Sequence, residues 1–329
     1  MILSVEGLVV QFPIRKGILT AVDNLSFSVA PGEVLGVVGE SGAGKSITGL
    51  AVIGLLEPPG RIAAGEVRLE GRRIDNLAHE ELRRIRGRRI GMVFQDPLTS
   101  LNPLYTIGRQ LEETILTHLE VDRAEARRRA VGLLSEVGIP APEGRLHHYP
   151  HQFSGGMRQR VVIALALAAE PVLVIADEPT TALDVSIQAQ IIALLKRLAA
   201  ERGVAIMLIT HDMGVIAETA HRVAVMYAGR IVEIGPVREV IHSPQHPYTA
   251  GLMGSIPKIS FSGTKERLAQ IDGAMPRLNA IPPGCAFNPR CPKRFARCLA
   301  ERPALMPAGT SQAACWLHEP RRASEPGRA

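Results

Sequence analysis

Hydrophobic and polar residues alternate over the first thirty positions of the chain, as they do in β-strands with one buried face. The alternating apolar positions are Leu3, Val5, Val9, Leu25, Phe27 and Val29. Turn-forming residues such as Pro31-Gly32 bound these runs, and the combination predicts antiparallel strands. Further along, residues 65–74 predict a hairpin that turns at Glu70-Gly71.

An unbroken apolar run, Val34 to Val38, predicts a strand that is buried on both faces. It leads into the glycine-rich segment Gly39 to Ser46. The apolar residues 47–56 that follow predict a helix, which the segment Glu57-Pro58-Pro59-Gly60 ends. This order of strand, glycine-rich loop and helix is typical of a loop that binds phosphate.

Three other predicted strands are each followed by polar side chains. These side chains, with their strands in parentheses, are Gln95 (90–94), Asp177 and Glu178 (172–175) and His211 (204–209). Open α/β sheets bind ligands at the carboxyl ends of their strands, so these positions are candidates for a functional site. Between the strands, residues 106–169 are predicted to be mostly helical.

The composition is that of a globular protein. Of the 329 residues 46% are hydrophobic, enough for the core of one large domain and a small one. The longest apolar run, Val161 to Ala169, is far shorter than the roughly 20 residues that cross a bilayer. Met1 to Val10 carries Glu6, with neither a basic start nor a cleavage pattern. We therefore expect a cytoplasmic protein, which would be a peripheral subunit in any membrane process.

The net charge is positive, formally +6, which would suit nucleic acid or a membrane surface. Much of the arginine is clustered in residues 72–89 and 127–129. Surfaces that bind single-stranded nucleic acid add aromatic rings as stacking platforms, but aromatic residues make up 4% of the chain and none interrupts these clusters. We interpret the clusters as a solvated or membrane-proximal face and expect no nucleic-acid partner.

The glycine-rich segment matches the pattern G-x-x-x-x-G-K-S. In such a loop the backbone N–H groups cradle phosphates, Lys45 reaches the β and γ oxygens, and Ser46 holds Mg²⁺. The predicted nucleotide-binding residues are Gly39, Ser41, Gly42, Gly44, Lys45 and Ser46.

An adjacent acidic pair, Asp177-Glu178, ends one of the buried strands. Asp177 is suited to hold Mg²⁺ through its water shell, and Glu178 to orient and deprotonate an attacking water. The pair alone could also be the acidic start of a helix, and lone residues such as Gln95 and His211 are more often ordinary polar side chains. The phosphate loop upstream favours the catalytic interpretation of the pair.

A second glycine motif, Ser154-Gly155-Gly156, precedes the apolar run 161–169. Ser154 is placed like a helix N-cap. The glycines leave backbone N–H groups bare at a helix end whose dipole favours phosphate. An ordinary capped helix has the same local pattern, so the motif alone decides nothing.

Over residues 1–255 the chain resembles the ATP-binding subunits of ABC transporters. The resemblance rests on the order and spacing of the phosphate loop, Gln95, Ser154-Gly155-Gly156, Asp177-Glu178, Ala182-Leu183-Asp184 and His211. It implies ATP and Mg²⁺ as ligands and Glu178 as the general base. Gln95 would be the Q-loop residue, which contacts the metal and couples the site to the membrane domain, and His211 the switch histidine at the γ-phosphate.

The same resemblance assigns residues that act across a dimer. Ser154 to Met157 would be the signature and Asp184 the D-loop residue, both facing the phosphate loop of a second subunit. The family usually has glutamine where this chain has Met157, so a polar contact from that side chain would be missing. Family members also stack an aromatic ring on adenine, and Phe12 is the candidate, beside a small insertion at residues 13–19.

Three further features resemble the dipeptide and oligopeptide importers, with nickel importers as close relatives. They are the segment from Phe94 to Pro103, the segment His246-Pro247-Tyr248-Thr249, and a cysteine-bearing tail. The resemblance implies a second, similar ATPase subunit, two membrane-spanning permease subunits and an extracytoplasmic binding protein, with this chain on the cytoplasmic face of the membrane. The rival is a non-transport ABC ATPase that acts on nucleic acid or ribosomes. Such proteins commonly carry two cassettes or a long coiled coil, and this chain has one cassette and no sustained heptads.

All four cysteines lie near the end of the sequence, at Cys285, Cys291, Cys298 and Cys315. A reducing cytoplasm disfavours disulfides. The tight C-x₂₋₄-C pair that zinc sites favour is missing, whereas a Cys₄ iron–sulfur cluster tolerates looser spacing. Iron–sulfur, Zn²⁺ and free thiols all remain open on the spacing, and the resemblance implies a [4Fe–4S] cluster.

Together these features predict a mixed α/β fold of the P-loop ATPase class. We expect an ABC nucleotide-binding domain over 1–255, with an antiparallel β subdomain and a helical subdomain over about 96–170. A small cysteine-containing domain is expected over 256–319, where prolines multiply and periodicity fades. Residues 320–329 are expected to form a loose tail.

Overall fold

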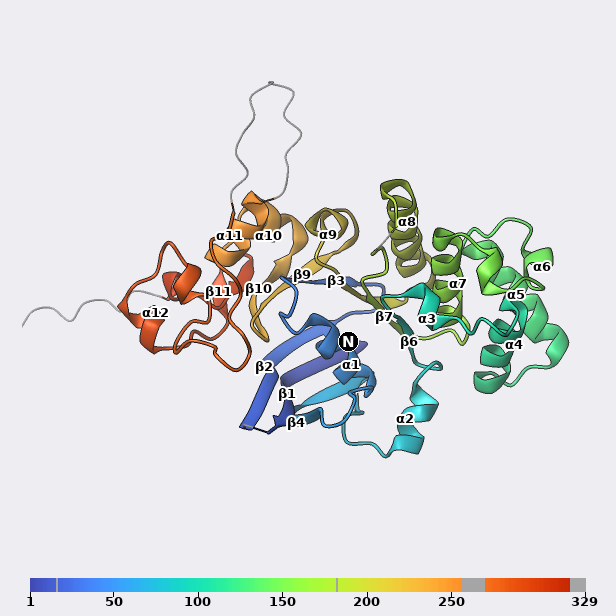
Figure 1. Cartoon of the computed structure of the whole chain (residues 1–329), viewed down its shortest axis with the longest axis horizontal. Coiled ribbons are helices and arrows are strands. Elements are labelled where there is room, and N and C mark those ends of the chain that lie inside the picture. The colour runs from blue at the N-terminus through green and yellow to red at the C-terminus, as the bar shows by residue number, and fades with distance from the viewer. Residues whose placement is uncertain (16, 182, 256–269, 320–329) are drawn as a thin grey trace, which may run out of the picture.

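The fold comes from a computed structural model of the chain, which describes residues 1–15, 17–181, 183–255 and 270–319 (Figure 1). The predicted tail 320–329 and the start of the predicted C-terminal domain, 256–269, lie outside the described residues. None of the helices that are described is long and apolar enough to cross a membrane.

The first sheet is antiparallel, as the alternation predicts, with the strand order β2-β1-β4-β5. Its strands are β1 (Leu3–Ile14), β2 (Gly17–Val29), β4 (Arg61–Leu69) and β5 (Arg72–Arg73). The predicted turn is confirmed, because Glu70 and Gly71 both have the positive φ that joins β4 to β5. The predicted insertion at 13–19 lengthens the β1–β2 hairpin, in which Pro13 pairs with Ile18.

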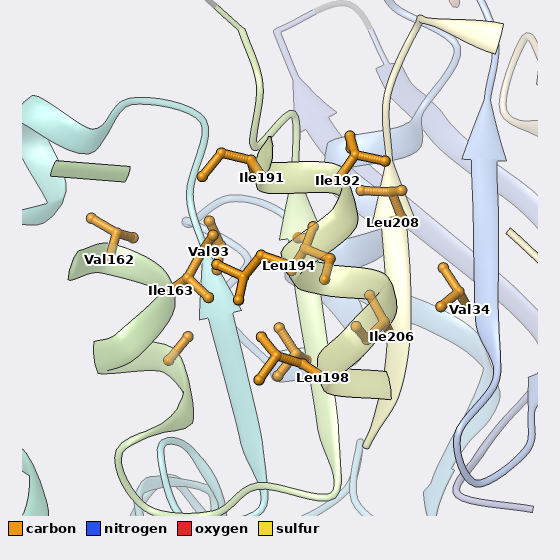
Figure 2. Close-up of a cluster of buried hydrophobic side chains, with 14 of the residues drawn as sticks. Val34, Val93, Val162, Ile163, Ile191, Ile192, Leu194, Leu198, Ile206 and Leu208 are labelled. Carbon is orange, nitrogen blue, oxygen red and sulfur yellow. The ribbon is translucent and has the colours of Figure 1, made fainter. Parts of the chain in front are cut away.

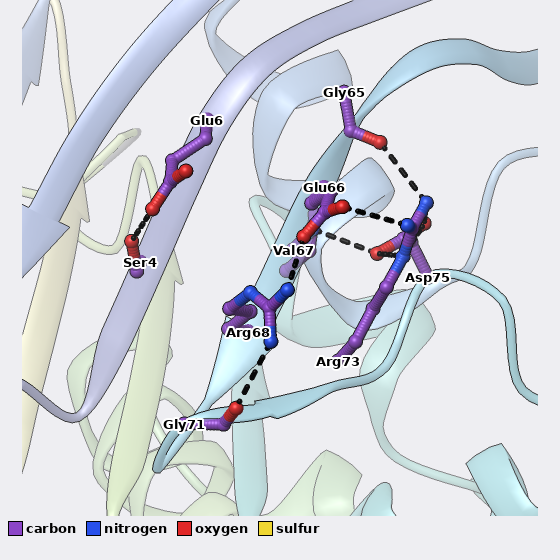
Figure 3. Close-up of polar contacts among 9 residues, drawn as sticks. All are labelled: Ser4, Glu6, Gly65, Glu66, Val67, Arg68, Gly71, Arg73 and Asp75. Atoms are coloured by element: carbon purple, nitrogen blue, oxygen red, sulfur yellow. Dashed lines mark hydrogen bonds and ion pairs between the residues drawn. The ribbon is translucent and has the colours of Figure 1, made fainter.

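A group of polar contacts stabilises β4 where the chain leaves this sheet (Figure 3). The Asp75 carboxylate accepts hydrogen bonds from the Val67 amide, at 2.7 Å, and from the Arg73 guanidinium, at 2.8 Å. The other arm of Arg73 donates to Glu66 at 2.8 Å. Because the Asp75 side chain is only 5% exposed, its partners replace most of its contact with water.

The second sheet has eight strands in the order β11-β12-β10-β9-β3-β8-β7-β6. The five strands from β9 to β6 are parallel, and β10, β12 and β11 add antiparallel pairs at one edge. The strands are β3 (Val34–Val38), β6 (Ile90–Val93), β7 (Leu173–Asp177), β8 (Ala205–Ile209), β9 (Arg222–Tyr227), β10 (Arg230–Pro236), β11 (Met306–Ala308) and β12 (Ser311–Ala313). The predicted central strands β3, β6, β7 and β8 are thus neighbours, and their carboxyl ends meet at one edge.

The glycine-rich segment joins β3 to helix α1, which runs over Lys45–Ile53. This helix begins and ends earlier than the predicted span of 47–56. It ends because Gly54 adopts a left-handed conformation, with φ of 71°, in which its N–H bonds back to the carbonyls of Ala51 and Leu50.

Residues between β6 and β7 form the predicted helical region. Its helices are α3 (Pro97–Ser100), α4 (Ile107–His118), α5 (Arg123–Glu136), α6 (Pro142–Arg145) and α7 (Gly155–Leu167). Val162 and Ile163 of α7 lie in one buried cluster with Leu194 and Leu198 of α8 (Val185–Arg202) and with Leu208 of the sheet (Figure 2). The cluster ties the helical region to the parallel sheet.

The remaining helices are short. They are α2 (His79–Ile85), α9 (Met213–Thr219), α10 (Val237–His242), α11 (Pro247–Gly254) and α12 (Ala296–Ala300). In Figure 1 the C-terminal residues around α12 and β11 lie at the opposite end of the molecule from α4 to α6. They are joined to the sheet because β12 pairs with β10, Glu233 lying opposite Ala313.

Candidate functional site

The glycine-rich segment between β3 and α1 has a shape that needs its glycines. Gly39 and Gly44 have φ of 153° and 99°. A Cβ on Gly39 would lie 2.3 Å from the carbonyl oxygen of Met226, and one on Gly44 would lie 2.7 Å from that of Ala21. Larger residues at these two positions would collide with the backbone. The glycines of the motif are therefore required for steric reasons.

The side chain of Lys45 folds back onto the glycine-rich loop. Its ammonium group donates to the carbonyl oxygens of Gly39, at 2.9 Å, and Glu40, at 3.1 Å. Burial lowers the pKa of Lys45, although the negative charges of Glu178, Asp177 and Glu40 oppose the shift. A buried cation enclosed by a glycine-rich loop at a helix start is an arrangement that binds phosphate.

Ser46 and Asp177 meet beside this cation. The Ser46 hydroxyl donates to Asp177 Oδ1 at 3.0 Å across 131 residues of sequence. Burial raises the pKa of Asp177, opposed by the hydrogen bond from Ser46 and by the charge of Lys45. The two oxygens are ligands of the kind that Mg²⁺ takes in phosphate-binding sites, and Gln95, the third predicted ligand, hydrogen-bonds to the neighbouring residue Glu178.

Glu178, next to Asp177, contacts three other polar side chains of the site. Its Oε2 accepts from Gln95 Nε2 at 3.1 Å and from Thr181 Oγ1 at 2.8 Å, and its Oε1 lies 3.2 Å from His211 Nδ1. Its backbone φ of 47° is unusual for a residue with a side chain. Desolvation would raise the pKa of Glu178, but the hydrogen bonds from Thr181 and His211 and the charges of His211 and Lys45 outweigh it and lower that pKa. An ionised carboxylate thus stands beside the phosphate loop.

The second glycine motif lies at the start of α7, as predicted. The Ser154 hydroxyl caps this helix by accepting from the Met157 amide at 3.4 Å. Gly155 is exposed and Gly156 is buried. A Cβ on Gly156 would lie 2.6 Å from Ile187 Cγ2 of α8. The glycine therefore lets the two helix starts approach closely.

Asp184 caps α8 next to this motif. Its carboxylate accepts from the Ile187 amide at 2.9 Å and from the Ser186 hydroxyl at 3.0 Å. Within the described residues, no hydrogen bond or ion pair joins Ser154, Gly155 or Asp184 to the phosphate loop 39–46. The contacts thus divide the candidate residues into two groups: Ser46 and Asp177 connect the phosphate loop to Glu178, and the Gly156–Ile187 contact connects the helix starts of Ser154 and Asp184.

Phe12 lies on β1 opposite Leu19, half-buried, with its ring against Gly60. Three residues that the motifs do not reveal also belong to the site: Thr181, which contacts Glu178, and Tyr248 and Arg290, which contact Glu40 of the phosphate loop. The segment 246–249 stands out in the sequence, but nothing local shows that its tyrosine reaches a loop 208 residues away.

The four cysteines line one small pocket, of about 20 Å³, together with His246 and Phe287. Burial raises the pKa of Cys285 to about 11 and that of Cys291 and Cys315 as well, which favours neutral thiols. In the part of the chain that the structure describes, no three or more His, Cys, Asp or Glu side chains form a group that could hold a metal ion. The expectation of an iron–sulfur or zinc site therefore finds no support in this geometry, because the space is that of about one water.

Comparisons with known proteins agree with this arrangement. A family model described as ABC transporter matches residues 22–181, and one described as Oligopeptide/dipeptide transporter, C-terminal region, matches residues 232–298. The dipeptide transport ATP-binding protein DppD of Escherichia coli (strain K12) is 49% identical over 315 residues, which are 95% of this chain and 96% of that protein. The chain belongs to the ABC transporter family. Like its relatives, it is a transport-coupled ATPase of the ABC type.

Other members of the ABC transporter family are similar in sequence or fold. The oligopeptide transport ATP-binding protein OppD of Bacillus subtilis (strain 168) is 50% identical over 87% of this chain and 80% of that protein. The solved dimer of the bacterial ABC transporter cassette MJ0796 is 32% identical, with a TM-score of 0.64, over 72% of this chain and 99% of that one. The ABC cassette fold predicted from the sequence is confirmed, with its antiparallel sheet, mixed sheet and helical region.

Proposed function

We propose that this chain is the ATP-hydrolysing subunit of a peptide importer, in which Glu178 is the general base. The observation that carries the proposal is the Glu178 carboxylate, held by Gln95, Thr181 and His211 beside the loop that contains Lys45. The description of its relatives as dipeptide and oligopeptide transport proteins supports a peptide cargo and disfavours nickel.

Binding of ATP is assigned to the phosphate loop. The amides of Gly39, Ser41, Gly42 and Gly44 would cradle the phosphates, and Lys45 would exchange its carbonyl contacts for β and γ oxygens. Ser46, Asp177 and Gln95 would hold Mg²⁺, which supplies positive charge to the phosphates when bound. Phe12 is assigned to stack on adenine. The approach of Ser46 to Asp177 at 3.0 Å supports the metal assignment.

Hydrolysis is assigned to Glu178. Its ionised carboxylate would orient a water and accept its proton, which the lowered pKa permits at neutral pH. Gln95 fixes one carboxylate oxygen and His211 the other, so both set the direction in which Glu178 points. His211, largely exposed, would in addition meet the γ-phosphate.

The second group of residues is assigned to a dimer. Ser154, Gly155, Gly156 and Asp184 would face the phosphate loop of another ATPase subunit, so that each ATP lies between two chains. The described hydrogen bonds of Ser154 and Asp184 go to their own helix starts and not to the chain's own phosphate loop, which supports this, as does the dimer in which the cassette MJ0796 was solved. ATP would close the dimer, and hydrolysis would reopen it and drive transport.

The remaining subunits follow from the proposed function. We expect a second ATPase chain, two membrane-spanning permease subunits contacted near Gln95, and an extracytoplasmic binding protein. The chain would lie peripherally on the cytoplasmic face of the membrane. The description of the relatives as peptide transport proteins favours transport over the rival function, a non-transport ABC ATPase that acts on nucleic acid or ribosomes.

Co-expression with candidate permease subunits tests the cargo. We expect the chain to co-purify with them and the reconstituted assembly to hydrolyse ATP faster when a binding protein and di- or oligopeptides are added. Stimulation of ATP hydrolysis by Ni²⁺ instead of peptides would show that the proposed peptide cargo is wrong, while the ATPase assignment would stand.

The cysteine pocket is the second element of the proposal. We assign residues 256–319 to a small C-terminal unit whose four thiols bind an iron–sulfur cluster or, failing that, Zn²⁺. The assignment rests on the resemblance of the tail to peptide importer subunits and on four thiols that share one pocket, and the pocket, of about 20 Å³, would have to widen to take a metal. Binding would displace the thiol protons, since thiolates are the ligands. Protein purified under anaerobic conditions that is colourless and contains neither iron nor zinc would contradict the assignment.

A further inference from the structure

A side chain from the C-terminal part of the chain reaches into the phosphate loop. Arg290 Nη1 lies 3.0 and 3.1 Å from the two carboxylate oxygens of Glu40, the second residue of that loop. The two residues are 250 positions apart in sequence. The Arg290 side chain is only 7% exposed and that of Glu40 29%, so this ion pair is partly shielded from water and salt.

The rest of the Arg290 guanidinium is held in place. Its Nε donates to the carbonyl oxygen of Asp272 at 2.9 Å and its Nη2 to that of Ile271 at 3.4 Å. Nη1 also lies 3.4 Å from the Tyr227 hydroxyl at the end of β9. A planar guanidinium fixed by several acceptors presents its charge to Glu40 in one direction.

Glu40 in turn is held at three points. Its backbone N–H donates to the Tyr248 hydroxyl at 3.0 Å, its carboxylate pairs with Arg290, and its carbonyl oxygen accepts from Lys45 at 3.1 Å. One residue therefore connects Arg290 to the cation that contacts phosphate. The negative charge of Glu40 is also among those that act on the pKa of Lys45.

A second contact comes from the same part of the chain. A Cβ on Gly42 would lie 3.1 Å from Met275 Cε, so Met275 packs directly on the phosphate loop. Behind Arg290, the ring of Phe287 packs against Tyr227 and Tyr248, with centroids 5.3 and 5.4 Å apart. The C-terminal segment thus touches the loop through packed groups and not through a lone surface contact.

The charge of Glu40 creates a problem for a loop that binds polyphosphate. Unpaired, its carboxylate would repel the phosphates and attract Lys45 away from them. Paired with Arg290, the same carboxylate is neutralised and its backbone is fixed where Lys45 needs it. Removal of the arginine would therefore weaken nucleotide binding even though no ligand contact is lost.

We propose that Arg290 is a positioning residue of the nucleotide site, through which the C-terminal segment sets the affinity of the phosphate loop for ATP. The inference rests on the proposed ATP site at Gly39 to Ser46. It assigns to residues 270–290 a role in ATP binding in addition to any metal that the neighbouring cysteines hold.

A double-mutant cycle on the full-length chain tests the proposal, with Mg·ATP affinity and the KM and kcat of hydrolysis as readouts. Arg290→Gln should weaken ATP binding by about tenfold, within the usual range for coupling between sites, and raise KM with kcat nearly unchanged. Adding Glu40→Gln to that variant removes the unpaired charge, so most of the affinity should return. A merely structural arginine would show no such rescue.

Two further variants guard against loss of the fold. Arg290→Lys keeps the positive charge and should bind ATP within a few-fold of the parent. Arg297→Ala removes a half-buried arginine that pairs with Glu301 and Glu319 and lies over the Trp316 ring, and should change neither affinity nor KM. Equal ATP affinity in the parent and in a folded Arg290→Gln, or equal losses with and without Glu40→Gln, would overturn the inference. Failure of the parent chain itself to bind ATP would instead refute the proposed site.

Discussion

The side-chain amide of Gln95 donates a 3.1 Å hydrogen bond to the carboxylate of Glu178, 83 residues further along the chain. Gln95 follows β6 and Glu178 follows β7, and these strands are parallel neighbours. The contact joins the residue assigned to sense the membrane domain to the residue assigned to activate water. A displacement at the end of β6 would therefore change the position of the residue that follows β7, and the reverse.

Replacing Glu178 by glutamine should leave nucleotide binding and abolish most turnover. The amide fills the same space but accepts no proton, so kcat should fall by roughly 10²- to 10³-fold. Steady-state hydrolysis together with ATP titration measures both effects. Glu201→Gln, on the exposed side of α8, is the matched control and should hydrolyse at the parental rate. Hydrolysis by Glu178→Gln at the parental rate would show that the base is wrongly assigned.

Lys45→Ala should lose nucleotide affinity. The variant removes a buried ammonium group, which hydrogen-bonds to the carbonyl oxygens of Gly39 and Glu40. When ATP is bound, the same group would neutralise charge on the phosphates. Equilibrium binding of a fluorescent ATP analogue measures the loss, with Lys196→Ala, an exposed lysine of α8, as control. Unchanged binding by Lys45→Ala would argue against the phosphate cradle.

Gly156→Ala should destabilise the fold more than Gly155→Ala. The new Cβ at Gly156 would lie 2.6 Å from Ile187 and force α7 and α8 apart, whereas at Gly155 the nearest atom, of Leu183, is 3.9 Å away. Overpacking of this kind costs about 1–3 kcal/mol, so thermal or denaturant unfolding should separate the two variants. Equal unfolding midpoints for Gly156→Ala and Gly155→Ala would mean that α7 and α8 accommodate the added methyl group without loss of stability.

Asp75 should contribute stability that disappears in acid. Burial alone would raise the pKa of Asp75, but hydrogen bonds from Arg73 and from the Val67 amide, with the charge of Arg73, outweigh it and lower that pKa (Figure 3). A carboxyl group with a lowered folded-state pKa stabilises the fold above its unfolded value, near 3.9, and loses that contribution as pH falls through the folded value.

Asp75→Asn should therefore lower the free energy of unfolding at pH 7 by about 1 kcal/mol and flatten its pH dependence below about pH 4. Denaturant titrations at a series of pH values measure both. Glu80→Gln, which removes an exposed pair with Arg83, should have almost no effect at pH 7. An Asp75→Asn variant as stable as the parent at pH 7 would contradict the assignment.

Local sequence predicted those parts of the fold that local physics governs. The strand Val34–Val38 was recognisable because every residue is apolar, and the loop after it because Gly39 and Gly44 need backbone shapes that side chains forbid. Ser154 was recognisable as a cap because its hydroxyl acts within one turn of helix. The strands β11 and β12 were not recognisable from the sequence, because a strand of three residues is too short to show a periodic pattern.

The sequence by itself predicted which residues of this protein are candidates for the chemistry, because motif, spacing and helix capping act over a few residues. Only the tertiary structure decided their neighbours. It brings Thr181 and His211 to Glu178, Arg290 to Glu40, and the four cysteines to one apolar pocket. Such contacts depend on strand order and on the packing of segments up to 250 residues apart. No local preference encodes them, so the contact between the C-terminal segment and the phosphate loop, on which the proposed control of that loop rests, became visible only in the folded chain.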